Sequence, residues 1–202
     1  MKVYQSHEIK NIALLGSKGS GKTTLAEAML YECGVIKRRG TVEGKNTVSD
    51  YFPVEKEYGY SVFSTVFYAE FLGKKLNVID CPGADDFVGS AITALNVTDT
   101  GVIGVEVGTQ NIFRTAENLN KPILFAMNQL DGEKADYDNV INQMHETFGN
   151  RIVQVQYPLS CGPSFNAMID VLLMKMYSWS PEGGTNSRKR NGKSPGIKSK
   201  IS

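Results

Sequence analysis

The residues best suited to carry chemistry in this chain form a glycine-rich stretch near its start. Residues 16–23 read GSKGSGKT, which fits the G-x-x-x-x-G-K-[ST] pattern of a phosphate-binding loop. Its glycines let the backbone curl so that successive N–H groups point at phosphate oxygens, and Lys22 adds a positive charge. The hydroxyl of Thr23 can bind a Mg²⁺ ion that bridges the phosphates. The predicted nucleotide-binding positions of this loop are Gly16, Ser17, Lys18, Gly19, Ser20, Gly21, Lys22, Thr23 and Thr24.

A strand and a helix must hold this loop in place, and the flanking sequence predicts both. Residues 12–15 are an apolar run that is typical of a buried strand. Residues 24–31 are good helix formers, which would place the phosphates at a helix N-terminus. The alternative is a glycine-rich turn that fits the pattern by chance, and the order strand, loop, helix argues against it.

A long polar segment over residues 34–60 follows the first helix. Loops of this length in a compact domain are usually functional, so we expect a segment that the γ-phosphate orders and that hydrolysis releases. An ordinary surface excursion is the alternative. Residues 61–71 and 76–80 then predict a hairpin of two strands.

The second strand of this hairpin ends in Asp80-Cys81-Pro82-Gly83, which fits the pattern D-x-x-G. The carboxylate of Asp80 could reach Mg²⁺, usually through water, and the N–H of Gly83 could approach the γ-phosphate. D-x-x-G by itself is often only a turn, but its place after a strand and downstream of a phosphate loop favours a functional one. Lys22 and Gly83 are the predicted catalytic residues.

A third motif would read the base. Residues 122–127 predict a buried strand that ends in Asn128-Gln129-Leu130-Asp131, which fits N-x-x-D. In guanine-nucleotide sites the aspartate accepts two hydrogen bonds from the base and the asparagine braces neighbouring loops, and adenine cannot form that pair. A helix-capping turn is the alternative. The position after a strand, third in order behind the other two motifs, favours guanine binding.

The remaining elements are predicted from periodicity. Residues 100–104 contain at most a short strand broken by glycines, and residues 151–157 predict the last strand. Ser160 and Cys161 follow that strand, where backbone N–H groups could face a base edge. Helices are predicted for residues 87–98, 109–118, 136–148 and 165–177. Five apolar residues of the last helix would face the core, namely Met168, Ile169, Leu172, Leu173 and Met176.

Composition predicts one globular domain over residues 1–180 and a basic, disordered tail over residues 181–202. The net charge is only +1, yet six of the 22 basic residues lie within residues 188–200, where there is no acid. The rest of the chain therefore carries 16 basic against 21 acidic residues, a net charge of about −5. The tail could contact RNA, and a solvated tail is the alternative.

Compartment and membrane contact can also be judged from the residues. The three cysteines are odd in number and widely spaced, which favours a reducing compartment over a disulfide framework. No signal peptide and no bilayer-spanning apolar stretch is present, so we expect a cytoplasmic protein without a membrane partner.

Taken together, residues 9–179 resemble the GTP-binding domain of bacterial elongation factor G, as a divergent paralogue that ends after this domain. Beyond the nucleotide motifs, the resemblance rests on residues 33–36, 55–61, 80–87 and 171–175. It implies an α/β P-loop NTPase fold of the Ras-like G-domain type, with a mostly parallel sheet between helices and one central strand shortened. Such a loss would leave ladder partners unpaired. The implied ligands are GTP, GDP and Mg²⁺, and the implied protein is a monomer with the ribosome as a candidate partner.

The resemblance also assigns residues to the metal and to the base. Ser61 stands where the family has its switch threonine. The implied metal-binding residues are Thr23, Ser61 and Asp80. The implied residues around guanine are Asn128, Gln129, Asp131, Ser160 and Cys161.

Three positions depart from the family pattern and bear on activity. Gly19 replaces an aspartate, Ala84 replaces the histidine that orients the attacking water or stabilises the transition state, and Gln129 replaces the lysine of N-K-x-D. Binding should survive these changes, whereas hydrolysis should be slow. Three functions therefore stay open: a translation-factor-like GTPase, a pseudo-GTPase that acts as a binding module, and a truncated fragment without an independent role.

Overall fold

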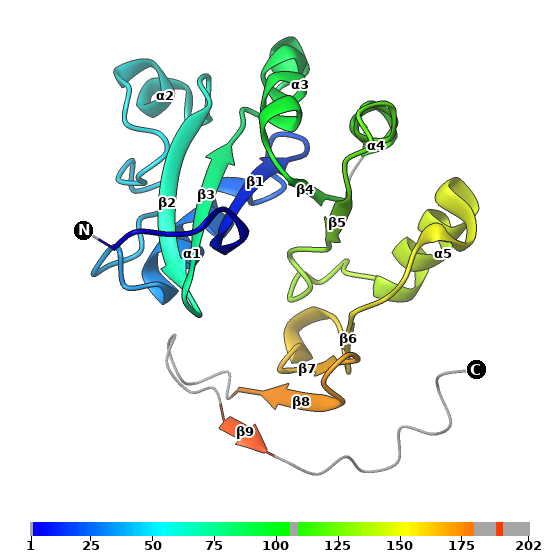
Figure 1. Cartoon of the computed structure of the whole chain (residues 1–202). Helices are drawn as coiled ribbons and strands as arrows, with labels where there is room; N and C mark the ends of the chain where they lie inside the picture. The colour runs from blue at the N-terminus through cyan, green and yellow to red at the C-terminus, as the bar shows by residue number, and fades with distance from the viewer. Residues whose placement is uncertain (1, 106–108, 180–188, 192–202) are drawn as a thin grey trace. The chain divides into compact units, whose positions relative to one another are not determined.

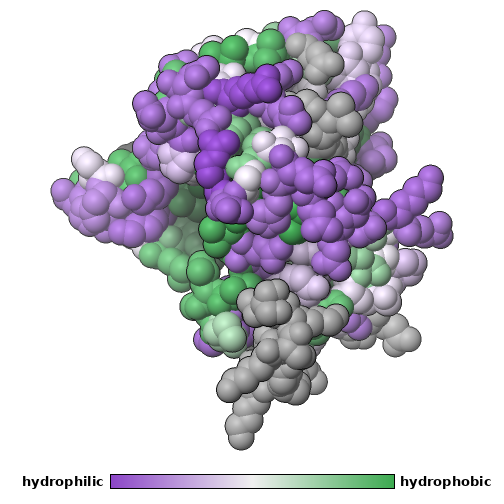
Figure 2. Space-filling view, turned by 90° about the vertical axis from the view of Figure 1, so that its right-hand side faces the viewer, coloured by the Kyte–Doolittle hydropathy of each residue, from purple (hydrophilic) through white to green (hydrophobic). Residues whose placement is uncertain are grey.

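The computed structural model describes residues 2–105, 109–179 and 189–191. The chain forms two compact units, Met1–Asn128 and Gln129–Ser202. No helix among the described residues is long and apolar enough to cross a membrane. On the face drawn in Figure 2, hydrophilic side chains predominate and hydrophobic ones form smaller patches.

The first unit is built on a five-stranded sheet with the strand order β2-β3-β1-β4-β5 (Figure 1). Strands β3, β1, β4 and β5 run parallel, and β2 pairs antiparallel with β3. Leu72 and Gly73 connect β2 to β3 with φ angles of 46° and 78°, the positive values that a two-residue hairpin turn requires. Both the hairpin and the mostly parallel sheet were predicted, and both are confirmed. The strands are β1 (Ile9–Leu15), β2 (Thr65–Phe71), β3 (Lys74–Asp80), β4 (Thr100–Gly104) and β5 (Ile123–Ala126).

Helices cover both faces of this sheet, because its parallel strands are apolar on both sides. Alternate residues of β1 belong to opposite clusters: Leu14 packs with Ala26 of α1, and Leu15 packs with Leu95 of α3. Both leucines of β1 are 1% exposed, so this strand lies at the centre of the core. The α-helices among the described residues of the unit are α1 (Lys22–Glu32), α2 (Pro53–Tyr58), α3 (Val88–Val97) and α4 (Thr109–Asn118), and Ser6–Glu8 and Asp85–Phe87 form short 3-10 helices.

Strand β4 is short but fully integrated. Its five residues lie between β1 and β5 and form parallel ladders of four residue pairs with each neighbour. The expectation of unpaired ladder partners is therefore wrong. The glycines that weakened the strand signal have a packing reason: a Cβ on Gly101 would lie 2.9 Å from Cδ1 of Ile123 and 3.0 Å from Cδ1 of Leu15.

Replacing Gly101 by valine is expected to destabilise the first unit by about 1–3 kcal/mol, because the added methyl groups overpack a closed core. The measurement is thermal denaturation of the purified chain. Gly89→Ala is the matched control, since a Cβ there would meet nothing within 4 Å. Equal melting temperatures for Gly101→Val and the unmodified chain would contradict the packing seen around β4.

The described residues of the second unit form one α-helix, two short 3-10 helices (Gly149–Arg151 and Gly162–Ser164) and a four-stranded antiparallel sheet of order β6-β7-β8-β9. The elements are α5 (Tyr137–Phe148), β6 (Gln156–Pro158), β7 (Ala167–Asp170), β8 (Lys175–Ser178) and β9 (Lys189–Asn191). The predicted helix over 136–148 is confirmed. The predicted strand over 151–157 is mostly wrong, because β6 begins only at Gln156.

The predicted closing helix over residues 165–177 is wrong, because this segment forms the hairpin of β7 and β8. Asp170 stops the first strand, since its Oδ1 accepts a hydrogen bond from the Leu173 N–H at 2.8 Å. Met174 then has a φ of 49°, which a helix does not allow. Leu172 and Leu173, which were predicted to face the core, are 75% and 57% exposed in the connecting turn.

The predicted boundary at residue 180 and most of the predicted tail lie outside the described residues. Within the tail, only Lys189–Asn191 is described, as strand β9, which pairs antiparallel with β8. The predicted disorder and RNA contact of residues 181–202 therefore stay predictions.

Candidate functional site

The phosphate loop lies where it was predicted, between the end of β1 and the start of α1. Gly21 precedes the helix with a φ of 86°, and a Cβ there would collide with the side-chain amide of Asn128. Gly16 has a φ of 126° and packs against the backbone of Gly104, 3.2 Å from where its Cβ would be. The loop glycines are thus needed for backbone shape and for close approach to β4.

Lys22 folds its ammonium group back over the loop. Its Nζ donates hydrogen bonds to the carbonyls of Gly16 at 2.9 Å and Ser17 at 2.7 Å. The Oγ of Ser20 lies 3.3 Å from the same nitrogen. The positive charge of Lys22 therefore lies above the loop, at the N-terminal end of an 11-residue helix. The lysine charge and the dipole of the helix both attract anions to this place.

Gly83 of the D-x-x-G segment lies directly against the phosphate loop. A Cβ on Gly83 would be 2.7 Å from the backbone nitrogen of Lys18 and would also collide with Nζ of Lys22. Only a residue without a side chain fits here. The segment that follows β3 thus meets the loop where the outer phosphates of a nucleotide would be bound.

Three residues predicted to bind a metal lie together beside this junction. The hydroxyl of Thr23 donates to Oδ2 of Asp80 at 3.0 Å, and the Ser61 hydroxyl donates to Oδ1 of Asp50 at 2.6 Å. The Thr23 and Ser61 hydroxyl oxygens lie 3.3 Å apart, within hydrogen-bond distance of each other. Oxygen donors in this arrangement suit Mg²⁺.

Asp80 has the environment of a metal-binding carboxylate. It is 1% exposed, and its Oδ1 is buried without a hydrogen-bond partner among the described residues. Burial raises the pKa of Asp80 to about 6, against the nearby Ser49 hydroxyl, the hydrogen bond from Thr23 and the charge of Lys22, which all favour the ionised form. A bound cation would favour the ionised carboxylate and satisfy the orphaned oxygen. The donor set therefore fits Mg²⁺.

Asp50 is a site residue that the sequence prediction missed. It is 5% exposed, it accepts the hydrogen bond from Ser61, and burial raises its pKa. Its charge also acts on Asp80 and helps to raise the pKa of that carboxyl. Nothing in the local sequence distinguishes Asp50 from other polar residues of the 34–60 segment, because its partner lies 11 residues downstream.

Two buried glutamates hold the long segment over residues 34–60, which contains the short helix α2. Glu27 of α1 accepts hydrogen bonds from the backbone N–H groups of Gly40 and Val48. Glu55 of α2 accepts bonds from the backbone of Phe52, Val62 and Phe63. Both glutamates are 1% exposed. The segment is therefore anchored at both of its halves, and Ser61 reaches Thr23 as a consequence.

The N-x-x-D motif crosses the boundary between the two units. In the first unit, the side-chain amide of Asn128 donates to the Ser20 carbonyl at 3.0 Å and so braces the phosphate loop. In the second unit, residues 129–132 form a turn in which Asp131 is exposed. The Gly162 N–H donates to the Leu130 carbonyl at 2.8 Å, so Ser160 and Cys161 belong to a loop beside this turn.

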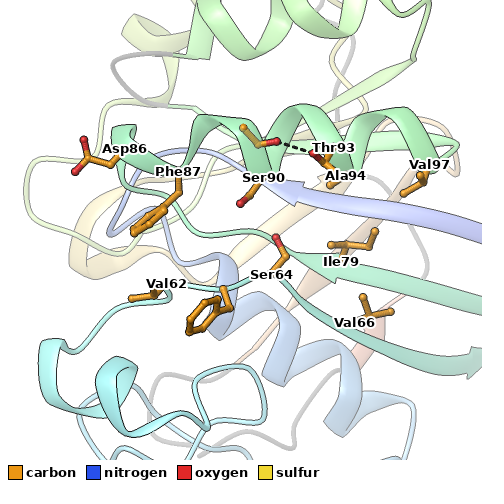
Figure 3. Close-up of a pocket in the computed structure, with 12 residues that line it drawn as sticks. Val62, Ser64, Val66, Ile79, Asp86, Phe87, Ser90, Thr93, Ala94 and Val97 are labelled. Carbon is orange, nitrogen blue, oxygen red and sulfur yellow. Dashed lines mark hydrogen bonds between the residues drawn. The ribbon is translucent and has the colours of Figure 1, made fainter.

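A groove of about 590 Å³ lies between α3 and the hairpin of β2 and β3 (Figure 3). Val62 and Ser64 line one side, directly after Ser61, and Asp86 and Phe87 line the other, shortly after Gly83. The walls of the groove therefore continue the two segments that meet the phosphate loop.

Comparison with known proteins assigns the family. The profile of the Elongation factor Tu GTP binding domain matches residues 7–184. The chain belongs to this family. It is accordingly the G domain of a translational GTPase family, and the resemblance inferred from the sequence is confirmed at that level.

Individual relatives of this G domain are translation factors. The chain is 35% identical over 177 residues to an elongation factor G-like protein of Thermotoga maritima, covering 85% of this chain and 25% of the relative. It is 31% identical to peptide chain release factor 3 of Streptococcus sanguinis, covering 80% and 34%. A crystal structure of a Thermus thermophilus protein superposes with a TM-score of 0.83 at 33% identity, covering 93% of this chain and 28% of the other. The chain thus spans about a quarter to a third of these proteins.

Two departures from the family pattern can be located in this G domain. Gly19 has a φ of 88°, and a Cβ there would meet nothing within 4 Å, so there is space for a side chain at this position. Ala84 lines a cavity of about 80 Å³ together with Gly83 and Asn111. The same cavity is also lined by Gly16 and Ser17 of the phosphate loop.

Proposed function

We propose that this G domain binds GTP and GDP with Mg²⁺ and hydrolyses GTP slowly. The observation that carries the proposal is the convergence of Thr23, Ser61 and Asp80 beside Lys22 and Gly83, since phosphate and metal ligands are then adjacent. The loop backbone and Lys22 would hold the phosphates, and Thr23 and Ser61 would bind Mg²⁺, with Asp80 acting directly or through water. When bound, Mg²⁺ would neutralise charge on the outer phosphates.

We further propose that Asn128, Gln129, Asp131, Ser160 and Cys161 form the guanine site. For Asn128 and Asp131 the support is the motif at the end of β5. For Ser160 and Cys161 it is weaker, because the closing helix that the assignment assumed is absent and a hairpin follows instead. Proximity of their loop to the 129–132 turn is the structural observation in favour.

We propose translation elongation on the ribosome, in the cytoplasm, as the setting. The support is the set of relatives, which includes elongation factor G of Petrotoga mobilis at 29% identity over 196 residues. The second candidate is a binding module whose nucleotide state sets partner affinity with little turnover, and Ala84 favours it. Binding and turnover of labelled GTP, measured with and without ribosomes, test both functions, since a slow GTPase forms GDP at a measurable rate that ribosomes raise only weakly, and a module binds without turnover.

GDP with Mg²⁺ is expected to raise the melting temperature of the chain by about 5–10 °C at a hundredfold excess over its Kd, because the ligand binds only the folded state. Chelating the metal should remove part of the shift. Lys22→Ala should abolish it, whereas Lys10→Ala, at an exposed position of β1, should keep it. If nucleotide left the melting temperature unchanged in the unmodified chain and in both variants, the proposed phosphate site would be contradicted.

A further inference from the structure

Lys18 is a second lysine in the phosphate loop, and its side chain is unusually placed. Its Nζ lies 3.8 Å from the centroid of the Tyr60 ring, a cation–π distance. Tyr60 directly precedes Ser61, whose hydroxyl oxygen is 3.3 Å from that of Thr23. The backbone of Lys18 meets Gly83, whose Cβ position is 2.7 Å from the Lys18 nitrogen.

Lys18 therefore stands where three segments of the site meet. The phosphate loop carries it, the 34–60 segment supplies the ring above its ammonium group, and the segment after β3 packs against its backbone. These last two segments are the ones expected to close on the outermost phosphate of a nucleotide. Lys22, by contrast, directs its ammonium at the carbonyls of Gly16 and Ser17 inside the loop.

The contact with Tyr60 leaves Lys18 able to bind an anion. A cation–π contact is electrostatic and uses none of the donor capacity of the ammonium, which has three N–H groups. An exposed contact of this kind is also weaker than a charge-assisted hydrogen bond to phosphate. The ring therefore restricts where the ammonium lies without competing with a phosphate for it.

We propose that Nζ of Lys18 binds the γ-phosphate of GTP, that Tyr60 positions it, and that this contact makes the site prefer GTP over GDP. The proposal rests on the nucleotide binding proposed above and adds the γ-phosphate contact. GDP ends at the β-phosphate, which the loop N–H groups and Lys22 hold, so it gains little from Lys18.

The test measures the affinity of the full chain for GDP and for a non-hydrolysable GTP analogue, both with Mg²⁺. Lys18→Met should weaken binding of the analogue roughly tenfold to a hundredfold and change GDP affinity by less than about threefold. Lys18→Arg, which keeps a phosphate-binding cation, should retain the preference. Tyr60→Leu should weaken the analogue by about threefold to tenfold, and Tyr60→Phe should not, because the ring face remains.

The matched control is Lys75→Met. Lys75 makes the same kind of contact, with its Nζ 4.9 Å from the Tyr68 ring centroid, on the β2–β3 hairpin and outside the phosphate loop. The inference is overturned if Lys18→Met keeps the analogue-to-GDP ratio of the control, or if it weakens both nucleotides equally while its melting temperature is unchanged. Failure of the unmodified chain to bind either nucleotide would overturn the proposed function as well, so the two failures are distinguishable.

Discussion

ATP is expected to compete for the nucleotide site at least about a thousandfold less well than GTP. The reason is hydrogen bonding: the carboxylate of Asp131 would accept two bonds from guanine, and adenine would leave it facing an unprotonated ring nitrogen and a C–H group. A site built around such a pair rejects a ligand that cannot complete it, because its polar groups lose their partners. The measurement is displacement of labelled GDP by each triphosphate.

Asp131→Asn should shift this preference towards xanthine nucleotides, because an amide can donate to the oxygen that replaces the amine of guanine. Glu133→Gln is the matched control, since Glu133 is exposed in the same loop. It should leave the preference for guanine intact. Equal affinity of the unmodified chain for ATP and GTP would refute the guanine assignment while leaving the phosphate site untouched.

The second large effect concerns the rate of hydrolysis. In a single-turnover assay the unmodified chain should hydrolyse bound GTP slowly and respond weakly to ribosomes. Binding requires the phosphate loop and Thr23, which are in place, whereas catalysis also requires a group that positions the attacking water. Ala84 offers no hydrogen bond at that position. Positioning and charge stabilisation of this kind are worth roughly a hundredfold to a hundred-thousandfold in related chemistry.

Ala84→His should therefore increase single-turnover hydrolysis by roughly tenfold to a hundredfold with little change in GTP affinity. Ala84→Phe tests whether a ring alone is enough, and it should not accelerate the reaction. Fast, ribosome-stimulated hydrolysis by the unmodified chain would show that another residue positions the water. Asn111, which lines the same cavity, would then be the first residue to replace.

Sequence patterns predicted the first unit well because its site is assembled at the carboxyl ends of strands. A parallel sheet places these ends along one edge, so motifs at residues 16–23 and 80–83 had to come together once the strands were assigned. The strand signal for Thr100–Gly104 is weak in the sequence, because glycine has a low strand propensity. In the structure, close packing against Ile123 and Leu15 requires a glycine at position 101, and local propensity does not include such contacts.

The second unit was predicted less well because one apolar stretch fits two periods. Met168, Ile169, Leu172 and Met176 suit a helix, but the pairing of Ile169 with Met176 across a hairpin fits the same residues. What decides between the two is the turn, where the Asp170 carboxylate receives the Leu173 N–H. This hydrogen bond forms only after the backbone has turned, so the sequence pattern alone does not predict it.

Residues that act through distant partners gave no local signal. Asp50 matters because Ser61 meets it, and Glu27 matters because its carboxylate receives the N–H groups of Gly40 and Val48, 13 and 21 residues away. A single sequence contains no pattern for contacts of this kind. These contacts can be identified only from the folded structure. The nucleotide motifs, in contrast, can be recognised in the sequence because their spacing is short and fixed.

The two glutamates that anchor residues 34–60 make partial detachment of this segment unfavourable. Glu27 and Glu55 each hold backbone N–H groups from two stretches, and a carboxylate that loses one donor stays buried with its charge less well satisfied. Each glutamate is therefore expected to lose all of its backbone N–H donors together, when water can reach the carboxylate. The segment should consequently detach as one cooperative unit, with amides from Gly40 to Phe63 exchanging their hydrogens together rather than fraying one by one from its ends.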